Sequence, residues 1–160
     1  MVSPYLEDEM SKITPVVNTN GSDSAMLDNT LEFFVMNGMP LPLAVMITIP
    51  EPWSNNKAME QEKKDFYQYY ATMMEPWDGP ASILFSDGDI MGAVLDRNGL
   101  RPSRYYITND GYLILSSEAG ALPIDESRIK VKDRLHPGKM LLVDLSLIHI
   151  SEPTRLRCIS

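Results

Sequence analysis

The stretch Glu75-Pro76-Trp77-Asp78-Gly79-Pro80 divides the chain into a helical part and a strand-like part. Before it, residues 60–74 place aromatic and Met side chains on one face and charged ones on the other, which predicts an amphipathic helix that Pro76 ends. After it, short segments rich in Ile, Leu, Val and Tyr alternate with turns, which predicts antiparallel strands. This order predicts an α+β fold, with helices first and an antiparallel meander second, the helices lying on one face of a sheet.

Two further helices are predicted upstream of this stretch. Ser22 or Ser24 is a suitable N-cap for the first, whose apolar positions follow at the spacing of one helix face. Asn37-Gly38 ends it, because both residues tolerate the left-handed conformation that follows a last turn. The apolar run 41–49 fits a buried helix or a strand, and Pro42, placed where a first helical turn accepts it, favours the helix.

Six strands are predicted after the dividing stretch. Asp87-Gly88-Asp89, Asn98-Gly99 and Asn109-Asp110-Gly111 are predicted to be hairpin-type turns, because Gly or Asn supplies a positive φ. The basic run 128–134 alternates with Asp133 and apolar residues, and is interpreted as a solvated strand edge. The predicted strands are 82–85, 90–95, 104–108, 112–116, 129–131 and 140–144.

Composition excludes several classes of protein. The chain has 160 residues, 44% of them hydrophobic, which suits one domain with a core. A formal net charge of −8 with scattered Lys and Arg argues against nucleic-acid binding. No apolar run is long enough to cross a membrane, and the acidic residues 7–9 do not suit a signal peptide, so a cytoplasmic protein is expected. Cys158, His136 and His149 are the only cysteine and histidines, so neither an intrachain disulfide nor a metal site is expected.

Taken singly, the polar motifs have ordinary structural interpretations. Asp23, in Gly21-Ser22-Asp23-Ser24, is either a first-turn acid favoured by the helix dipole or a carboxylate that binds an ammonium group in a pocket. Residues 86–89 resemble a calcium loop but lack its closing Glu, so a turn is predicted. Residues 95–102 join two strands and have too few glycines for a phosphate-binding loop. His136 precedes a turn and is predicted to be structural.

The order of these motifs resembles that of the class II glutamine amidotransferases. The segments similar to ones that recur across that class are Asn98-Gly99-Leu100-Arg101-Pro102, Ser117-Glu118 and Pro137-Gly138. Within the class, residues 74–80 and 95–102 are similar to those of the glutamate synthases. The resemblance covers residues 3–144, so residues 1–144 are interpreted as the C-terminal portion of an amidotransferase domain.

The resemblance implies an N-terminal-nucleophile hydrolase fold, an αββα sandwich of which this chain holds a part. It implies hydrolysis of glutamine to glutamate and ammonia by an N-terminal cysteine, with an upstream Asn-Gly pair as oxyanion hole. Asp23 matches the aspartate that holds the α-ammonium of glutamine. The cysteine, a substrate-binding arginine and the oxyanion pair are expected upstream of Met1. No catalytic residue is therefore assigned in this chain, which is expected to be inactive alone, and Asn98-Gly99 is not the oxyanion pair.

The resemblance also implies a parent protein with a second half, in which ammonia and 2-oxoglutarate form glutamate. That half would carry FMN and an iron–sulfur cluster and take electrons from NAD(P)H or ferredoxin, while this chain itself would hold no cofactor. The expected partners are glutamine, the rest of the large subunit and a small electron-supplying subunit, with no nucleic acid and no membrane. The alternative is a stand-alone, non-catalytic domain that uses the same fold for binding or assembly.

Residues 145–160 are predicted to be a non-native tail. The run from Leu145 to Arg155 resembles the translation of a transposon-end adapter used in preparing sequencing libraries. The alternative is a natural amphipathic C-terminal segment. On the adapter interpretation, Cys158 and His149 carry no functional information and the natural sequence continues past Asp144. This interpretation favours a truncated enzyme over a stand-alone domain.

Overall fold

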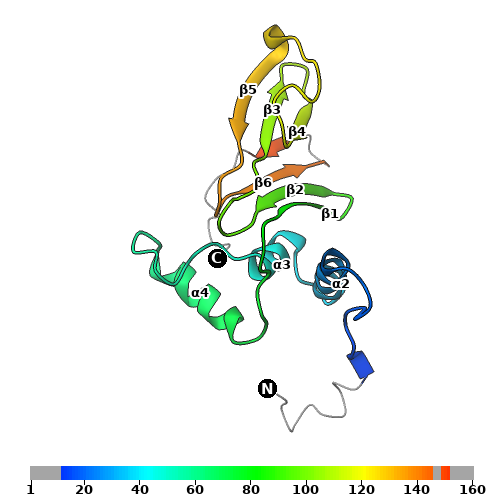
Figure 1. Cartoon of the computed structure of the whole chain (residues 1–160), viewed down its shortest axis with the longest axis vertical. Coiled ribbons are helices and arrows are strands. Elements are labelled where there is room, and N and C mark those ends of the chain that lie inside the picture. Colours follow the sequence, from blue (N-terminus) through cyan, green and yellow to red (C-terminus); the bar gives the residue numbers. More distant parts are fainter. Residues whose placement is uncertain (1–11, 146–148, 152–160) are drawn as a thin grey trace. The chain divides into compact units, whose positions relative to one another are not determined.

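The computed structural model describes residues 12–145 and 149–151 (Figure 1). The predicted tail 145–160 therefore lies mostly outside the described residues. The chain divides into two compact units, residues 1–48 and 49–160, each with its own elements. In the described ranges, no helix combines the length and the hydrophobicity that crossing a membrane requires.

The first unit contains two helices that pack against each other, α2 (Asp23–Met36) and α3 (Leu41–Thr48). Ser22 is the N-cap of α2, and Gly38 follows the helix with a φ of +86°. α3 is apolar along its whole length and five of its eight residues are buried, as expected for a helix without a polar face. Both predicted helices are confirmed.

The second unit begins with a loop and α4 (Gln61–Ala71), which is shorter than the predicted helix 60–74. Residues 72–74 form a tight turn instead, in which the backbone N–H groups of Thr72 and Met73 donate to carbonyls three residues earlier, at 3.2 and 2.9 Å. Helices commonly tighten in this way at their last turn, because the carbonyls left without partners there accept shorter-range bonds.

The rest of the second unit is two antiparallel sheets, which confirms the α+β class and the strand-rich second part (Figure 1). The first sheet has the order β1 (Ser82–Ser86), β2 (Ile90–Leu95), β6 (Met140–Asp144) and β7 (His149–Ser151). The second has the order β4 (Leu113–Ser116), β3 (Arg104–Thr108) and β5 (Ile129–Arg134), and the short helix η1 (Glu126–Arg128) precedes β5. As predicted for the basic run, β5 is a solvated edge strand.

The predicted meander is wrong at three of the five connections between its six strands, because β2 and β3, β4 and β5, and β5 and β6 do not pair. β2 pairs with β1 and β6, and β3 pairs with β4 and β5, so β2 and β3 are not a hairpin. The turn at Asn98-Gly99 exists, with the N–H of Gly99 donating to the carbonyl of Asp96 at 2.9 Å, but it carries the chain from one sheet to the other. Local turn chemistry reverses the chain without determining which strands pair. The hairpins at residues 87–89 and 109–111 are confirmed.

Side chains from both sheets share one core in the second unit. Strand alternation sends Tyr105 and Ile107 of β3 into this core and places Arg104 and Tyr106 on the opposite face. Tyr105 is only 1% exposed. The buried members of the core are Ala93, Leu95, Tyr105, Ile107, Leu135 and Leu141.

Candidate functional site

Asp23, the predicted substrate-binding residue, is the first residue of α2 and is exposed. The capping role belongs to Ser22, whose Oγ accepts the backbone N–H of Ala25 at 3.3 Å and lies 3.0 Å from Oγ of Ser24. Within the described part of the chain, the Asp23 carboxylate has no hydrogen bond or ion pair. This carboxylate is therefore not used in capping and is accessible to a cationic ligand group.

The two motifs that resemble glutamate synthases most closely lie against each other in the second unit. Arg97 donates to Asp78 at 2.8 Å, and Nε of Arg101 donates to the carbonyl of Pro80 at 3.2 Å. Charged side chains from both loops thus join the start of β1 to the end of β2, beyond the backbone hydrogen bonds that pair the two strands. We call this pair of loops, residues 77–81 and 96–102, the loop junction.

Asp96 is the centre of the loop junction and is 2% exposed. Its Oδ1 accepts the N–H of Ala81 at 3.1 Å, and its Oδ2 accepts the N–H of Asn98 at 3.0 Å. A carboxylate withdrawn from water needs such donors, since burial without them is costly. Sequence reasoning treated Asp96 only as part of the segment 95–102 that joins two strands and did not identify this role.

The Pro137-Gly138 motif packs onto the loop junction. A Cβ added at Gly99 would lie 2.3 Å from Cγ of Pro137, so only glycine fits this contact, and its φ of +60° also favours glycine. The next residue, Gly138, approaches Glu51 closely: a Cβ added at Gly138 would lie 2.7 Å from Oε2 of Glu51. The structure therefore brings three of the recognised motifs together.

Glu51 connects this region to α4. Its carboxylate forms an ion pair with Lys63 and accepts a hydrogen bond from the Tyr67 hydroxyl at 3.2 Å. The Glu51 side chain is 14% exposed, so these partners compensate a largely desolvated charge. The cluster holds the loop before α4, the helix and the turn at Gly138 in one arrangement.

The remaining motifs take structural roles. Ser116 donates to the carbonyl of Glu118 at 2.7 Å at the end of β4. His136 is partly exposed, and its Nε2 lies 4.0 Å from Oδ1 of Asp133. Asp87 accepts N–H groups two and three residues further on, at 3.1 and 2.8 Å, which confirms a turn at residues 86–89. In the residues that the structure describes, no group of three or more His, Cys, Asp or Glu side chains is placed to hold a metal ion.

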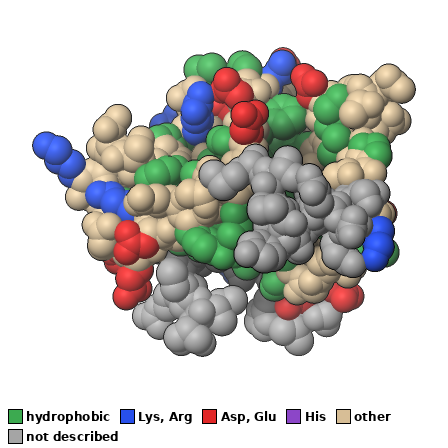
Figure 2. All heavy atoms as spheres, turned by 90° about the horizontal axis from the view of Figure 1, so that it is seen from below, with side chains coloured by type: hydrophobic (Ala, Val, Ile, Leu, Met, Phe, Trp, Pro, Cys, Tyr) green, Lys and Arg blue, Asp and Glu red, His purple; other side chains and the backbone are tan. Residues whose placement is uncertain are grey.

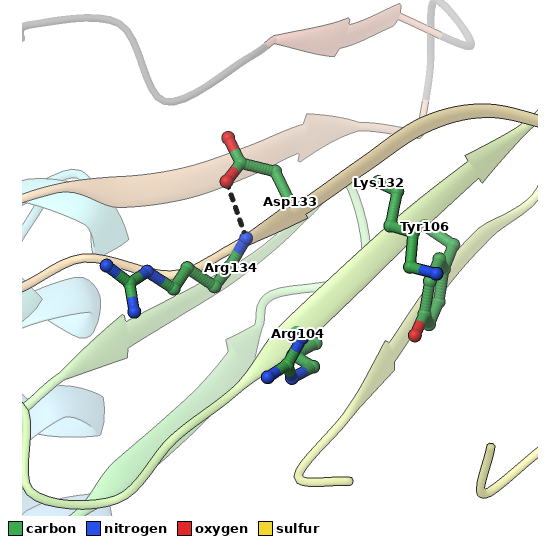
Figure 3. Close-up of a pocket in the computed structure, with 5 residues that line it drawn as sticks. All are labelled: Arg104, Tyr106, Lys132, Asp133 and Arg134. Atoms are coloured by element: carbon green, nitrogen blue, oxygen red, sulfur yellow. Dashed lines mark hydrogen bonds between the residues drawn. The ribbon is translucent and has the colours of Figure 1, made fainter. Parts of the chain in front are cut away.

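A hollow of about 200 Å³ lies on the exposed face of the three-stranded sheet (Figure 3). Sequence reasoning missed it, because residues 128–134 were interpreted without their partner strand. The available signal was the alternation of basic residues along β5, but it locates a site only once the register with β3 is known. The residues that line the hollow are Arg104, Tyr106, Lys132, Asp133 and Arg134.

A family model described as glutamine amidotransferases class-II matches residues 1–157 of the chain. Over 144 residues the chain is 52% identical to a protein of Bacillus subtilis named glutamate synthase [NADPH] large chain, covering 90% of this chain and 10% of that protein. It is 46% identical to glutamate synthase [NADH] of Saccharomyces cerevisiae over 158 residues, covering 98% of this chain and 7% of that protein.

A third relative is the ferredoxin-dependent glutamate synthase of Antithamnion sp., 51% identical over 146 residues, which are 90% of this chain and 10% of that protein. The chain thus spans a tenth or less of the length of these relatives. Their names specify three electron donors, yet their identities to this chain are similar. The matched region therefore does not distinguish between the donors.

Proposed function

We propose that this chain, which belongs to the class II glutamine amidotransferases, is part of the glutamine-hydrolysing domain of a glutamate synthase. The observation that carries the proposal is the 52% identity over residues that include the loop junction. In such a domain a cysteine thiol attacks the side-chain amide of glutamine and releases ammonia, and water then releases glutamate from the thioester. The parent would use the ammonia, with 2-oxoglutarate, to make glutamate.

Asp23 is the residue of this chain that we assign to substrate binding, as the partner of the α-ammonium group of glutamine. Its exposed carboxylate supports this role, because Ser22 caps the helix in its place. An ammonium group that leaves water on binding needs a fixed anion, and a charge-assisted hydrogen bond supplies one.

The cofactors belong, in this proposal, to the rest of the parent. One cysteine, Cys158, cannot supply the thiolates of an iron–sulfur cluster, so the residues present do not fit that group. FMN, the cluster and the NAD(P)H or ferredoxin site are therefore proposed for the remaining large subunit and a small electron-supplying subunit. The expected cytoplasmic location stays a prediction.

The αββα sandwich also belongs to the proposal. Two antiparallel sheets that share a core through Leu95 and Tyr105 support it. Completing the sandwich requires helical layers and further strands from the parent, so we expect the isolated chain to be poorly stable.

The substrate role is tested by Asp23→Asn in the full-length parent. Loss of a charge-assisted contact worth about 2 kcal/mol raises KM for glutamine roughly 30-fold, while synthesis from added ammonia is unchanged. Asp28→Asn is the matched control, since Asp28 is an exposed acid of the same helix outside the motif. An Asp23→Asn enzyme with the wild-type KM would show that Asp23 acts only as a first-turn acid of α2 and does not bind glutamine.

The 160-residue chain itself is expected to release no ammonia from glutamine, because the attacking cysteine is not among residues 1–144. A coupled assay of ammonia with the purified chain measures this directly. Ammonia release faster than in buffer alone would contradict the proposal that the nucleophilic cysteine lies in the part of the parent outside this chain. In the stand-alone alternative, a full-length gene product containing this domain would also release no ammonia.

A further inference from the structure

We infer that the hollow on the three-stranded sheet is a binding site for a small multivalent anion, a molecule carrying two carboxylates or linked phosphates. The hollow is formed by neighbouring strands, with Arg104 and Tyr106 on β3 and Lys132 and Arg134 on β5. Figure 3 shows the two guanidinium groups on adjacent strands and the Lys132 side chain beside the Tyr106 ring. None of the lining residues is Asp23, and the inference does not depend on the proposed function.

The register places like charges opposite each other. Arg104 pairs directly with Arg134, and Tyr106 pairs with Lys132. Like charges at directly opposed positions of an antiparallel pair destabilise the sheet. A bound multivalent anion removes that repulsion and gains hydrogen bonds from both guanidinium groups, whose planar donors match carboxylate and phosphate oxygens.

Ion pairs within the described part of the protein neutralise the three cations of the hollow only weakly. Among the described residues, neither the Arg104 nor the Arg134 guanidinium has an ion pair. Lys132 lies 3.8 Å from Glu126, but both side chains are more than half exposed, and such pairs contribute little. Asp133 also lines the hollow, although the register places it beside Tyr105, and its Oδ1 accepts the N–H of Arg134 at 2.7 Å.

The concentration of positive charge is local. The chain as a whole carries a formal charge of −8. On the face of the molecule shown in Figure 2, Lys and Arg side chains are interspersed with Asp and Glu. In the hollow, by contrast, three cations meet one carboxylate. An anion approaching this negatively charged protein is therefore favoured at this location.

The Tyr106 ring forms the wall of the hollow. It is 7% exposed, and Nζ of Lys132 lies 5.7 Å from its centroid, a distance at which the ring attracts the ammonium group. This contact keeps the exposed Lys132 ammonium group near the face of the sheet. A volume of about 200 Å³ lies below the range of pockets for drug-sized ligands, so the site suits a small anion.

Titration calorimetry of the full 160-residue chain at low salt, at a temperature where circular dichroism shows it to be folded, tests the inference, with succinate as the dicarboxylate, pyrophosphate as the linked phosphate and acetate as the monoanion. We expect succinate or pyrophosphate to bind at least tenfold more tightly than acetate, and the better of the two identifies the ligand chemistry. Arg104→Gln and Arg134→Gln should each weaken that binding at least tenfold. Equal affinity for all three anions would reject the site.

Lys130→Gln is the matched control, because Lys130 is an exposed cation of β5 that does not line the hollow. It should change the affinity by less than twofold, and an equal loss in this variant would show attraction by net charge alone. Thermal unfolding gives a second measurement that does not require a variant to fold well. The tighter-binding of succinate and pyrophosphate should raise the Tm of the wild-type chain more than acetate does at equal ionic strength, and an equal Tm would contradict the inference.

Discussion

Asp96 and Ala81 are joined by two hydrogen bonds: the N–H of Ala81 donates to Oδ1 of Asp96 at 3.1 Å, and the N–H of Asp96 donates to the carbonyl of Ala81 at 3.0 Å. This pair fixes the start of β1 against the end of β2. Because the same carboxylate also accepts the N–H of Asn98, one buried side chain organises both loops of the junction.

Asp96→Ala should therefore destabilise the second unit by about 3 kcal/mol, because it leaves two backbone donors without their acceptor. Urea unfolding followed by tryptophan fluorescence measures the loss. Asp78→Ala is the control, since it removes an exposed partner of Arg97 and should cost less than about 1 kcal/mol. Equal effects of the two substitutions would contradict the central role of Asp96.

Gly99→Ala should be more destabilising than Gly111→Ala, although both glycines have positive φ values. An alanine at either position is strained by about 1 kcal/mol. Only at Gly99 does the new Cβ also collide with Pro137, which adds about 1–3 kcal/mol, whereas no atom lies within 4 Å of a Cβ added at Gly111. Pro137→Ala should recover part of the loss in a double-mutant cycle. Purely additive effects would show that the collision is relaxed elsewhere.

Ser22→Ala should destabilise α2 by about 1 kcal/mol, because it removes the oxygen that accepts the N–H of Ala25. Ser24→Ala, which removes only the contact with the Ser22 hydroxyl, should change stability by less than about 0.5 kcal/mol. Helix content followed by circular dichroism during thermal unfolding compares the two. A larger loss for Ser24→Ala would show that Ser24, and not Ser22, caps α2.

Stability should fall in acid partly through Asp110. Its pKa is lowered from the ordinary value of 3.8 by hydrogen bonds with Thr108 and then with Arg128. A carboxylate with a lowered folded-state pKa stabilises the fold fully above its unfolded value and loses that contribution as the pH falls through the folded pKa. The Tm of Asp110→Asn should therefore decline less than that of the wild type below about pH 4. An unchanged decline would mean that Asp110 is not part of this acid response.

Local residue chemistry predicted most element boundaries. Ser22 marks the start of α2 through its capping side chain, whereas Asn37-Gly38 and Gly111 end a helix and form a turn through their backbone preferences, and these boundaries are confirmed. Strand pairing was not predictable in the same way. Whether β2 joins β3 or β6 depends on side chains far apart in the sequence, which meet only in the assembled core.

The same contrast between local and long-range contacts explains which candidate sites could be proposed from the sequence. Asp23 could be proposed from the sequence because its neighbours form a recognisable motif within a few residues. The hollow was not found, since Arg104 and Arg134 become neighbours only through the register of β3 and β5. The role of Asp96 was missed for a related reason: its partner Ala81 is fifteen residues away.

The connection between the two sheets also has an evolutionary consequence. The N–H of Leu135 donates to the carbonyl of Ser103 at 2.8 Å, so the residue before β3 lies beside the residue after β5. The segment that contains β3, β4 and β5 therefore begins and ends at the same place in the fold. Changes of length at the far end of this excursion, near residues 117–125, need not alter the spacing between β2 and β6. Homologues can therefore gain or lose residues there while the strands that carry the loop junction keep their alignment.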